Sequence, residues 1–481
     1  MNNALETALA RTSPRIAPPP TPLASIVIHL GVMVLWFILF ARAFFLHGVV
    51  AWSTGIAYVV YDTVLLIFVA WKACVLLKPV RSPGAVGGTA PQPTLGVIVA
   101  AHNEAAVLPI TLDALFAQTR PPQQIVIADD GSTDATAALL VERYGLADPG
   151  EGRLSAPSAQ YPNLRWLKLP HGGKARALNA ALLAVDTDTL MTVDADTLLE
   201  PDACAAMADA YRSEPKLVAA AGLLTPVCNK SVRGRFFQWF QTYEYIRNFI
   251  SRFAWMRADS LLLVSGAFAC FRRDAVMAVG GFDPHCLVED YELIHRLRRY
   301  SARERLGWDV RVIGAARART DAPGTLASFL RQRRRWFAGF LQTQYWYRDM
   351  TGNRRFGKLG LMMLPVKAFD TVQPIYGLTA FVLLLGFLFE GRFTIVLPVL
   401  AVIAGKIVID LAFHLFSVHL YRRWSGDCAS SSFGMALLAA IFEPFSFQLM
   451  RHSGAALGWF HFLLGRSKWG VQERTGLNAP G

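Results

Sequence analysis

Long apolar runs at both ends of the chain constrain its fold more than any other feature. Five runs are apolar over most of their length: 24–46, 49–77, 361–389, 393–421 and 432–464. The first four are long enough to cross a bilayer, which takes about 20 helical residues. The sequence therefore predicts two transmembrane helices within 23–78 and a C-terminal transmembrane region over 361–465. Breaks at Glu443 and Arg451 leave the fifth run open to three interpretations: two short spans, a re-entrant hairpin, or one span and an interfacial helix.

The positive charge of the chain lies beside these runs. The net charge is +13, and 53% of the residues are hydrophobic while only 17% are charged. Arginine blocks at Arg331–Arg335, Arg354–Arg355 and Arg422–Arg423 flank apolar runs, which is the pattern of cytoplasmic loops. Because no separate basic domain exists, we expect a lipid bilayer and no nucleic acid as partner. The six cysteines have no C-x-x-C spacing, which favours reduced thiols over a zinc site or disulfide framework.

Composition also marks the boundaries of a central domain. Residues 1–22 are rich in Pro and Ala and are predicted to be a disordered cytoplasmic tail. A Gly/Pro-rich linker at 82–93 precedes a domain that we place at 94–350. The remaining 466–481 are predicted to be a cytosolic C-terminal segment.

The central domain alternates short apolar runs with helical patterns. The strand-like runs are 95–100, 124–128, 164–169 and 190–193. This βαβ rhythm predicts an α/β domain with a mostly parallel sheet. Polar residues follow the four predicted strands: Asn103 and Glu104, Asp129 and Asp130, Lys174, and Asp194 with Asp196. Because ligands bind at the carboxyl ends of such strands, these side chains are candidates for one site.

Asp194 and Asp196 are the strongest candidates for metal ligands. They end the strand-like stretch that begins at Thr189, and side chains two apart on a strand point to the same side. Carboxylate oxygens suit Mg²⁺ or Mn²⁺, which take further ligands from water and from phosphates. The alternative is a solvated Asp-x-Asp turn.

Two stretches combine aromatic and basic residues at helical spacing, 230–259 and 328–347. Helices of this kind often lie at a membrane surface. The alternative is an ordinary amphipathic helix packed on the domain.

Together these motifs resemble the membrane-embedded family 2 glycosyltransferases that include cellulose, chitin, hyaluronan and poly-N-acetylglucosamine synthases. The resemblance covers residues 95–350 and the layout of the flanking spans. The following stretches carry it: Ala101–Glu104, Asp129–Asp134, His171–Asn179, Asp194–Asp196, Ser265–Ala267, Val288–Asp290 and Gln332–Trp336. It implies a GT-A-type nucleotide-sugar-binding domain between N- and C-terminal transmembrane helices. Val288 departs from the Thr that the family usually has, which puts in doubt a polar role for that position.

The resemblance also implies roles for the donor-binding residues. Asn103, Glu104 and Asp194 would line the nucleotide-sugar site, and Asp130, or less favourably Asp129, would accept a hydrogen bond from the base. Lys174 would add a positive charge near the phosphates; otherwise it is a solvated loop lysine.

Roles in the transfer step follow in the same way. Asp290 and Glu289 are the candidate catalytic residues, and Asp290 would be the base for an attacking sugar hydroxyl; the alternative is that Asp290 caps a helix. Gln332, Arg335 and Trp336 would contact the acceptor or the diphosphate: Arg335 would reach the diphosphate, and Trp336 would stack on the acceptor sugar. The competing explanation for this arginine-rich helix is contact with lipid headgroups. Trp469 and Arg474 resemble a segment that some family members fold over the nucleotide.

The function implied is a processive inverting transferase in a bacterial inner membrane, with its catalytic domain in the cytosol. It would polymerise UDP-N-acetylglucosamine or UDP-glucose into a β-linked polysaccharide and export it. Accessory membrane or periplasmic subunits are candidate partners. Asp62, Asp370, Gln373 and Asp410 lie within apolar runs and would line a channel or serve helix packing. The alternatives are a non-processive enzyme that adds one sugar to a lipid, and a sensing scaffold without activity.

Overall fold

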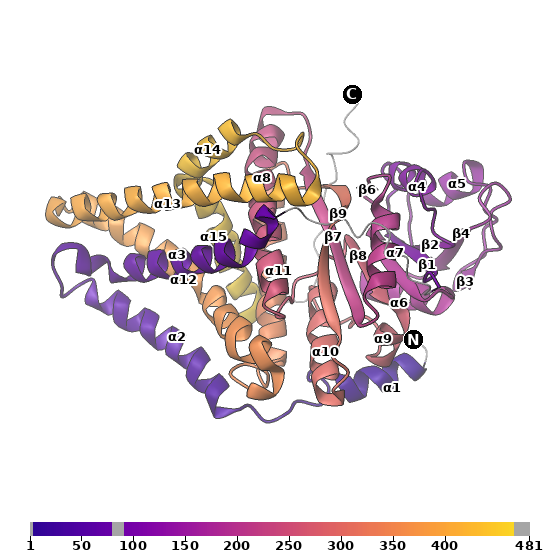
Figure 1. Ribbon diagram of the computed structural model, residues 1–481, viewed down its shortest axis with the longest axis horizontal. Helices are drawn as coiled ribbons and strands as arrows, with labels where there is room; N and C mark the ends of the chain where they lie inside the picture. The colour runs from indigo at the N-terminus through magenta and orange to yellow at the C-terminus, as the bar shows by residue number, and fades with distance from the viewer. Residues whose placement is uncertain (1–2, 79–90, 466–481) are drawn as a thin grey trace.

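A mixed sheet forms the centre of the domain between the two groups of apolar helices (Figure 1). The computed structural model describes residues 3–78 and 91–465. The strands are β1 (Leu95–Ala101), β2 (Gln124–Asp130), β3 (Arg153–Leu154), β4 (Leu164–Leu169), β5 (Thr189–Asp194), β6 (Thr197–Leu199), β7 (Leu217–Val227), β8 (Phe268–Arg272) and β9 (Asp309–Asp321). Their order in the sheet is β3-β4-β2-β1-β5-β8-β7-β9-β6.

The four predicted strands form the parallel half of this sheet. β2 lies between β4 and β1, β5 follows on the other side of β1, and all four run parallel. The prediction of a mostly parallel sheet is confirmed for this half only. β8 pairs antiparallel with both β5 and β7, and β7 pairs parallel with β9. The carboxyl ends of β1, β2, β4 and β5 therefore share one edge, where the predicted site residues follow them.

Two long helices separate the sheet from the apolar helices (Figure 1). The helices of the domain are α4 (Leu108–Phe116), α5 (Thr136–Glu142), α6 (Lys174–Ala184), α7 (Ala203–Ser213), α8 (Val232–Arg257), α9 (Arg273–Ala278), α10 (Glu289–Glu304) and α11 (Leu326–Trp346). The Ser231 side chain caps α8, and a capping box of Thr325 and Ser328 begins α11. α8 packs on β7 and β9, and also on α3 and α13 among the apolar helices. The predicted aromatic helix therefore packs between the two layers, which is the alternative to a free interfacial helix.

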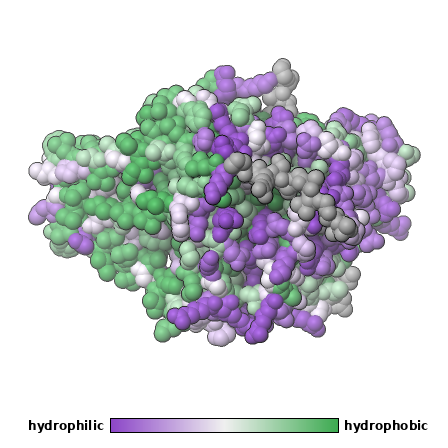
Figure 2. All heavy atoms as spheres, viewed as in Figure 1, coloured by the Kyte–Doolittle hydropathy of each residue, from purple (hydrophilic) through white to green (hydrophobic). Residues whose placement is uncertain are grey.

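Four helices are long and apolar enough to cross a membrane, at 23–42, 48–77, 359–389 and 393–425. Their segments are α2 (Leu23–Arg42), η1 (Gly48–Trp52), α3 (Ser53–Ala73), η2 (Cys74–Leu77), η4 (Leu359–Met363), α12 (Leu364–Phe389) and α13 (Phe393–Ser425). The short η3 (Arg354–Phe356) precedes η4, and α14 (Phe433–Phe442), η5 (Glu443–Phe445) and α15 (Phe447–Leu463) follow α13. The last apolar run is a pair of helices bent by 51° between 433–445 and 447–463. Figure 2 shows hydrophobic residues gathered over the end of the molecule formed by these helices.

Acidic residues within these apolar helices are paired across helices. Lys406 of α13 contacts Asp62 of α3 at 2.7 Å and also pairs with Asp410. Asp370 of α12 accepts hydrogen bonds from Tyr61 at 2.5 Å and Lys367 at 2.6 Å. Pairing of this kind offsets the cost of charge in a span and agrees with a role in helix packing.

The prediction of a disordered N-terminal tail is wrong. Residues Asn3–Thr12 form helix α1, which packs on α9. Leu5 and Leu9 are buried in this contact. The compositional argument failed because the surface that stabilises α1 lies far away in sequence, at the end of α9.

Candidate active site

A cavity of about 1000 Å³ opens at the carboxyl ends of β1, β2 and β5, and α8, α10 and α11 form its opposite wall. Most of the predicted site residues line it: Asn103, Glu104, Asp130, Lys174, Asp194, Asp196, Glu289, Asp290, Gln332, Arg335 and Trp336. Residues from six separate stretches of sequence thus meet in one space. Trp469 and Arg474 lie outside the described residues.

Asp129 is the exception among the predicted residues. It is buried, and its carboxylate accepts hydrogen bonds from the backbone N–H of Ser132 at 2.9 Å and from Nε1 of Trp166 at 3.2 Å. Because successive side chains of a strand point to opposite sides, Asp130 faces the cavity and Asp129 does not. The predicted nucleotide contact of Asp129 is therefore corrected to a structural role beneath the loop.

Asp130 joins the loops that follow β2 and β4. Its carboxylate accepts hydrogen bonds from the backbone N–H groups of Gly172 at 2.7 Å and Gly173 at 2.9 Å. On the same side of the cavity, Oδ1 of Asn103 accepts from the N–H of Thr133 at 2.7 Å. Asp130 and Asn103 thus hold the loops in addition to lining the cavity.

Two histidines that sequence reasoning missed lie over Asp130. The rings of His102 and His171 stack with centroids 4.4 Å apart. Ligand atoms of His102, Asp130 and His171 lie within 4.8 Å of one another, so this cluster could hold a metal ion. Imidazole ligands suit Zn²⁺ better than Mg²⁺, so the cluster differs in chemistry from the all-carboxylate pair Asp194 and Asp196.

Lys174 begins α6 and lies among acidic side chains. Its Nζ atom pairs with Asp194 and lies 3.7 Å from Glu289. Burial opposes the charge of Lys174, but Asp194 and Glu289 outweigh it and raise the lysine pKa. Burial raises the pKa of Glu289 despite the opposing charge of Lys174. The site therefore holds a fixed cation beside Asp194, the first of the predicted metal ligands.

Asp290 lies in the first turn of α10 with its carboxylate held by two donors. One oxygen accepts from the N–H of Gly266 at 2.6 Å and the other from the N–H of Tyr291 at 2.8 Å. A Cβ at position 266 would lie 3.0 Å from the Cβ of Asp290, so this close approach favours glycine. Asp290 is thus not the N-cap of α10, which is Val288.

Some polar residues of helix α11 face the cavity, and others face α8. Gln332, Arg335 and Trp336 line the cavity, whereas Arg333 donates two hydrogen bonds, of 2.9 and 2.7 Å, to Glu244 of α8. Arg333 is 9% exposed. Contact with lipid headgroups therefore does not explain Arg333, because its guanidinium is bound inside the protein.

Helix α8 contributes a face that sequence reasoning missed. Tyr245, Asn248, Phe249 and Arg252 line the cavity, and their spacing places them on one side of a helix. Nε and Nη1 of Arg252 are buried and have no hydrogen-bond partner within residues 3–78 and 91–465. Burial lowers the pKa of Arg252 to about 10. The helical spacing was the available signal, but the aromatic content pointed to the membrane instead.

The fold of this domain is that of a GT-A-type glycosyltransferase. The chain is similar in structure to a mannosyltransferase from Pyrobaculum calidifontis, solved in complex with GDP-Man and Mn²⁺, with a TM-score of 0.52 and 21% sequence identity. The superposition covers 82% of this chain and 99% of the mannosyltransferase. At this identity the likeness establishes the fold alone.

Two family models match the sequence. The model described as glycosyl transferase family group 2 matches residues 189–447, and that of glycosyl transferase family 2 matches residues 96–280. The chain therefore belongs to glycosyl transferase family group 2, and it is a glycosyltransferase.

Similar curated proteins include two poly-β-1,6-N-acetyl-D-glucosamine synthases. The protein from Staphylococcus epidermidis is 24% identical over 285 residues, which is 59% of this chain and 62% of the relative. The protein from Staphylococcus aureus strain COL is 27% identical over 249 residues, which is 50% of this chain and 53% of the relative. The match thus spans less than two thirds of the length of either synthase.

Proposed function

We propose that this glycosyltransferase is a processive, inverting polysaccharide synthase of a bacterial inner membrane. It would polymerise UDP-N-acetylglucosamine or UDP-glucose into a β-linked polymer and move the polymer across the membrane. The observation that carries the proposal is the convergence of the candidate metal, base and Gln-x-x-Arg-Trp residues in one cavity, one wall of which is α8, a helix that also packs on α3 and α13. The two synthases similar in sequence support the polymer-forming class.

In the proposed reaction, Asp290 accepts the proton of an acceptor hydroxyl as that oxygen bonds to the anomeric carbon of the donor. Two backbone donors fix the direction of its carboxylate. A single base opposite the leaving group gives in-line displacement and inverts the anomeric centre. Arg335 would bind the departing diphosphate with its planar fork, and Trp336 would stack on the acceptor sugar.

A divalent cation, Mg²⁺ or Mn²⁺, fits the donor set of Asp194 and Asp196. Both residues line the cavity at the end of β5, and carboxylate oxygens are the ligands that these ions prefer. A bound ion would offset the charge of the diphosphate. Lys174 pairs with Asp194 and would add a second positive charge to the same anion.

The proposed orientation places the catalytic domain in the cytosol, where nucleotide-sugars would reach the cavity. Arg423, at the end of α13, donates hydrogen bonds to the carbonyl oxygens of Leu76 at 3.2 Å and Leu77 at 2.9 Å. The domain-facing ends of α3 and α13 therefore lie together, and the arginine there supports a cytosolic location.

The test is donor turnover by purified protein in nanodiscs with Mg²⁺, using UDP-glucose, UDP-N-acetylglucosamine and UDP-glucuronate in turn. Long products from one donor are expected. UDP release with only single-sugar lipid products would instead indicate the non-processive transferase. Absence of release with every donor would contradict the proposal for the isolated chain and direct attention to accessory subunits.

Asp290→Asn provides the matching test of the base. We expect the transfer rate to fall about 10²- to 10⁴-fold while the affinity for UDP, measured by calorimetry, is retained. Asp148→Asn is the control, because Asp148 lies outside the cavity, where it pairs with Lys168 and accepts from the N–H of Gly150, and the substitution should leave the rate unchanged. A fully active Asp290→Asn variant would exclude Asp290 as the base.

A further inference from the structure

The segment before the first apolar helix packs on the catalytic domain, against the loop that precedes Glu289 and Asp290. We call residues 3–15 the N-terminal arm and residues 279–288 the Gly-Gly loop. The loop joins the end of α9 to Glu289, the first residue of α10. Any shift of this loop therefore moves Glu289 and Asp290.

Backbone lies directly on backbone where the arm meets the loop. Gly280 has φ +89°, and a Cβ there would lie 2.3 Å from the backbone nitrogen of Leu9 and 2.7 Å from the carbonyl oxygen of Leu5. Oγ1 of Thr12 donates a hydrogen bond of 2.8 Å to the carbonyl oxygen of Val279. The contact leaves no room for a side chain at Gly280, so the arm and the loop fit one another closely.

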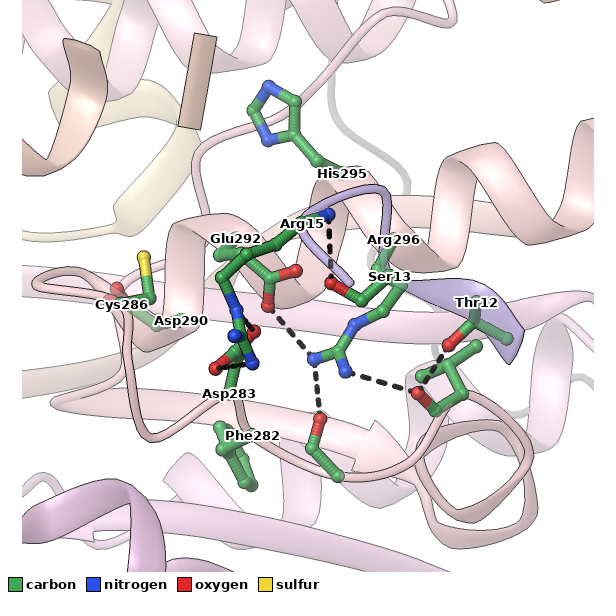
Figure 3. Close-up of polar contacts among 12 residues, drawn as sticks. Thr12, Ser13, Arg15, Phe282, Asp283, Cys286, Asp290, Glu292, His295 and Arg296 are labelled. Carbon is green, nitrogen blue, oxygen red and sulfur yellow. Dashed lines mark hydrogen bonds and ion pairs between the residues drawn. The ribbon is translucent and has the colours of Figure 1, made fainter. Parts of the chain in front are cut away.

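Arg15 adds a charged contact to this fit (Figure 3). Its Nε and Nη2 atoms donate to the two carboxylate oxygens of Asp283, at 2.8 and 3.1 Å. The Asp283 side chain is fully buried, whereas that of Arg15 is 24% exposed. Asp283 also accepts from the N–H of His285 at 2.9 Å. The arm therefore supplies the cation that balances a buried carboxylate of the loop.

Two helices of the candidate active site, α10 and α6, hold the Gly-Gly loop on its other sides. Arg296 of α10 donates to the carbonyl oxygens of Val279 at 3.1 Å and Gly281 at 2.6 Å. Asn179 of α6, the helix that begins with Lys174, donates to the carbonyl oxygen of Phe282 and accepts from its N–H, both at 2.7 Å. The Gly-Gly loop is thus clamped between the arm and the helix that carries Lys174.

We propose that Arg15 is a positioning residue for the transfer reaction. Through Asp283 it holds the Gly-Gly loop, and through the loop it keeps Glu289 and Asp290 in place opposite Lys174 and Asp194. Arg15 does not line the cavity and touches no reacting group. The functional part of this inference rests on the proposed function, because it takes Asp290 as the base.

Steady-state kinetics of full-length variants test the proposal. Arg15→Met is expected to lower kcat about 10- to 100-fold, the effect of a displaced catalytic group, with little change in the donor KM. Arg15→Lys keeps one charged contact and should restore much of the rate. Arg11→Met removes a positive charge from the same arm without touching the Gly-Gly loop, and its kcat should match that of the wild type.

A double variant separates positioning from stability. Arg15→Met leaves Asp283 buried without its cation and should lower the Tm, whereas Arg15→Met with Asp283→Asn removes both charges and should recover it. We expect kcat to stay low in the double variant because the link to the loop is still missing. Recovery of kcat together with Tm would overturn the proposal and leave a purely structural ion pair.

Hydrogen exchange of the same proteins is independent of activity. Backbone amides of residues 281–290 should exchange faster in Arg15→Met and in the double variant than in the wild type or Arg11→Met. Unchanged exchange would overturn the proposal even if kcat fell. If the wild type transfers no sugar at all, the proposed function fails, and the exchange measurement alone decides whether the arm holds the loop.

Discussion

At the scale of single residues, the protonation of Glu289 makes the stability of the fold depend on pH. Burial raises its pKa above the ordinary value of 4.5 although Lys174 acts in the opposite direction. The folded chain therefore holds this proton at pH values where the unfolded chain has released it. As pH rises from 4.5 through the raised pKa, the ionisation of Glu289 removes stability from the fold.

Glu289→Gln abolishes this titration and so gives a prediction with a definite sign. The Tm of the wild type minus that of Glu289→Gln should decrease as pH rises from about 4.5, and become constant above the raised pKa. Thermal scans in buffers of increasing pH measure the difference. A difference that stays constant or increases with pH would contradict the raised pKa of Glu289.

Arg252 is the residue whose surroundings point most clearly to an anionic part of the substrate. Its guanidinium lines the cavity with two buried nitrogens that have no partner in the described part of the chain. We expect Arg252→Met to lower kcat/KM about 10- to 100-fold, since hydrogen bonds to a charged group contribute about 1.5–3 kcal/mol. Arg252→Lys should recover only part of this, because an ammonium group lacks the planar fork.

The control for Arg252 is Arg257→Met, which removes an exposed arginine from the end of the same helix. Its kcat/KM should equal that of the wild type. Equal values for Arg252→Met and Arg257→Met would show that the buried guanidinium does not bind substrate.

At the scale of helices, the close packing of α15 on α11 positions one wall of the cavity. A Cβ at Gly458 would lie 2.7 Å from the Cβ of Phe337 and 3.0 Å from the carbonyl oxygen of Arg334. Gly458→Ala should therefore push α11 away, destabilise the protein by about 1–3 kcal/mol and lower the transfer rate. Gly386→Ala on α12, where a Cβ meets nothing within 4 Å, is the control and should preserve both.

The same elements show which parts of the structure the sequence predicts. β1, β2 and β5 contain short apolar runs, and β4 keeps four apolar residues around Arg165 and Lys168, so the pattern is local and the prediction of these strands is confirmed. β9 alternates buried with more exposed residues, which is the pattern of a half-buried strand that the prediction did not include. β7 is an apolar run rich in Ala, a residue with low preference for strands, so its strand pattern is weaker. Helix α1 depends on Gly280, far along the chain, and no local rule identifies such a partner.

At the scale of the whole molecule, the native cysteines can show on which face of the membrane the catalytic domain lies. In the described part of the chain, Cys204, Cys228, Cys270 and Cys286 are buried in the domain, whereas Cys74 and Cys428 are exposed. Cys428 follows α13, whose end is bonded to the end of α3 through Arg423. Cys428 should therefore lie on the same membrane face as the catalytic domain.

A membrane-impermeant maleimide tests this arrangement without any introduced cysteine. If the domain is cytosolic, Cys428 should be labelled in inverted inner-membrane vesicles and protected in intact spheroplasts. Cys428→Ser identifies the signal that belongs to this residue, and Cys74→Ser does the same at the end of α3. Labelling of Cys428 in intact spheroplasts would place the cavity on the outer face, where nucleotide-sugars made in the cytosol would not reach it, and so would contradict the proposed donor.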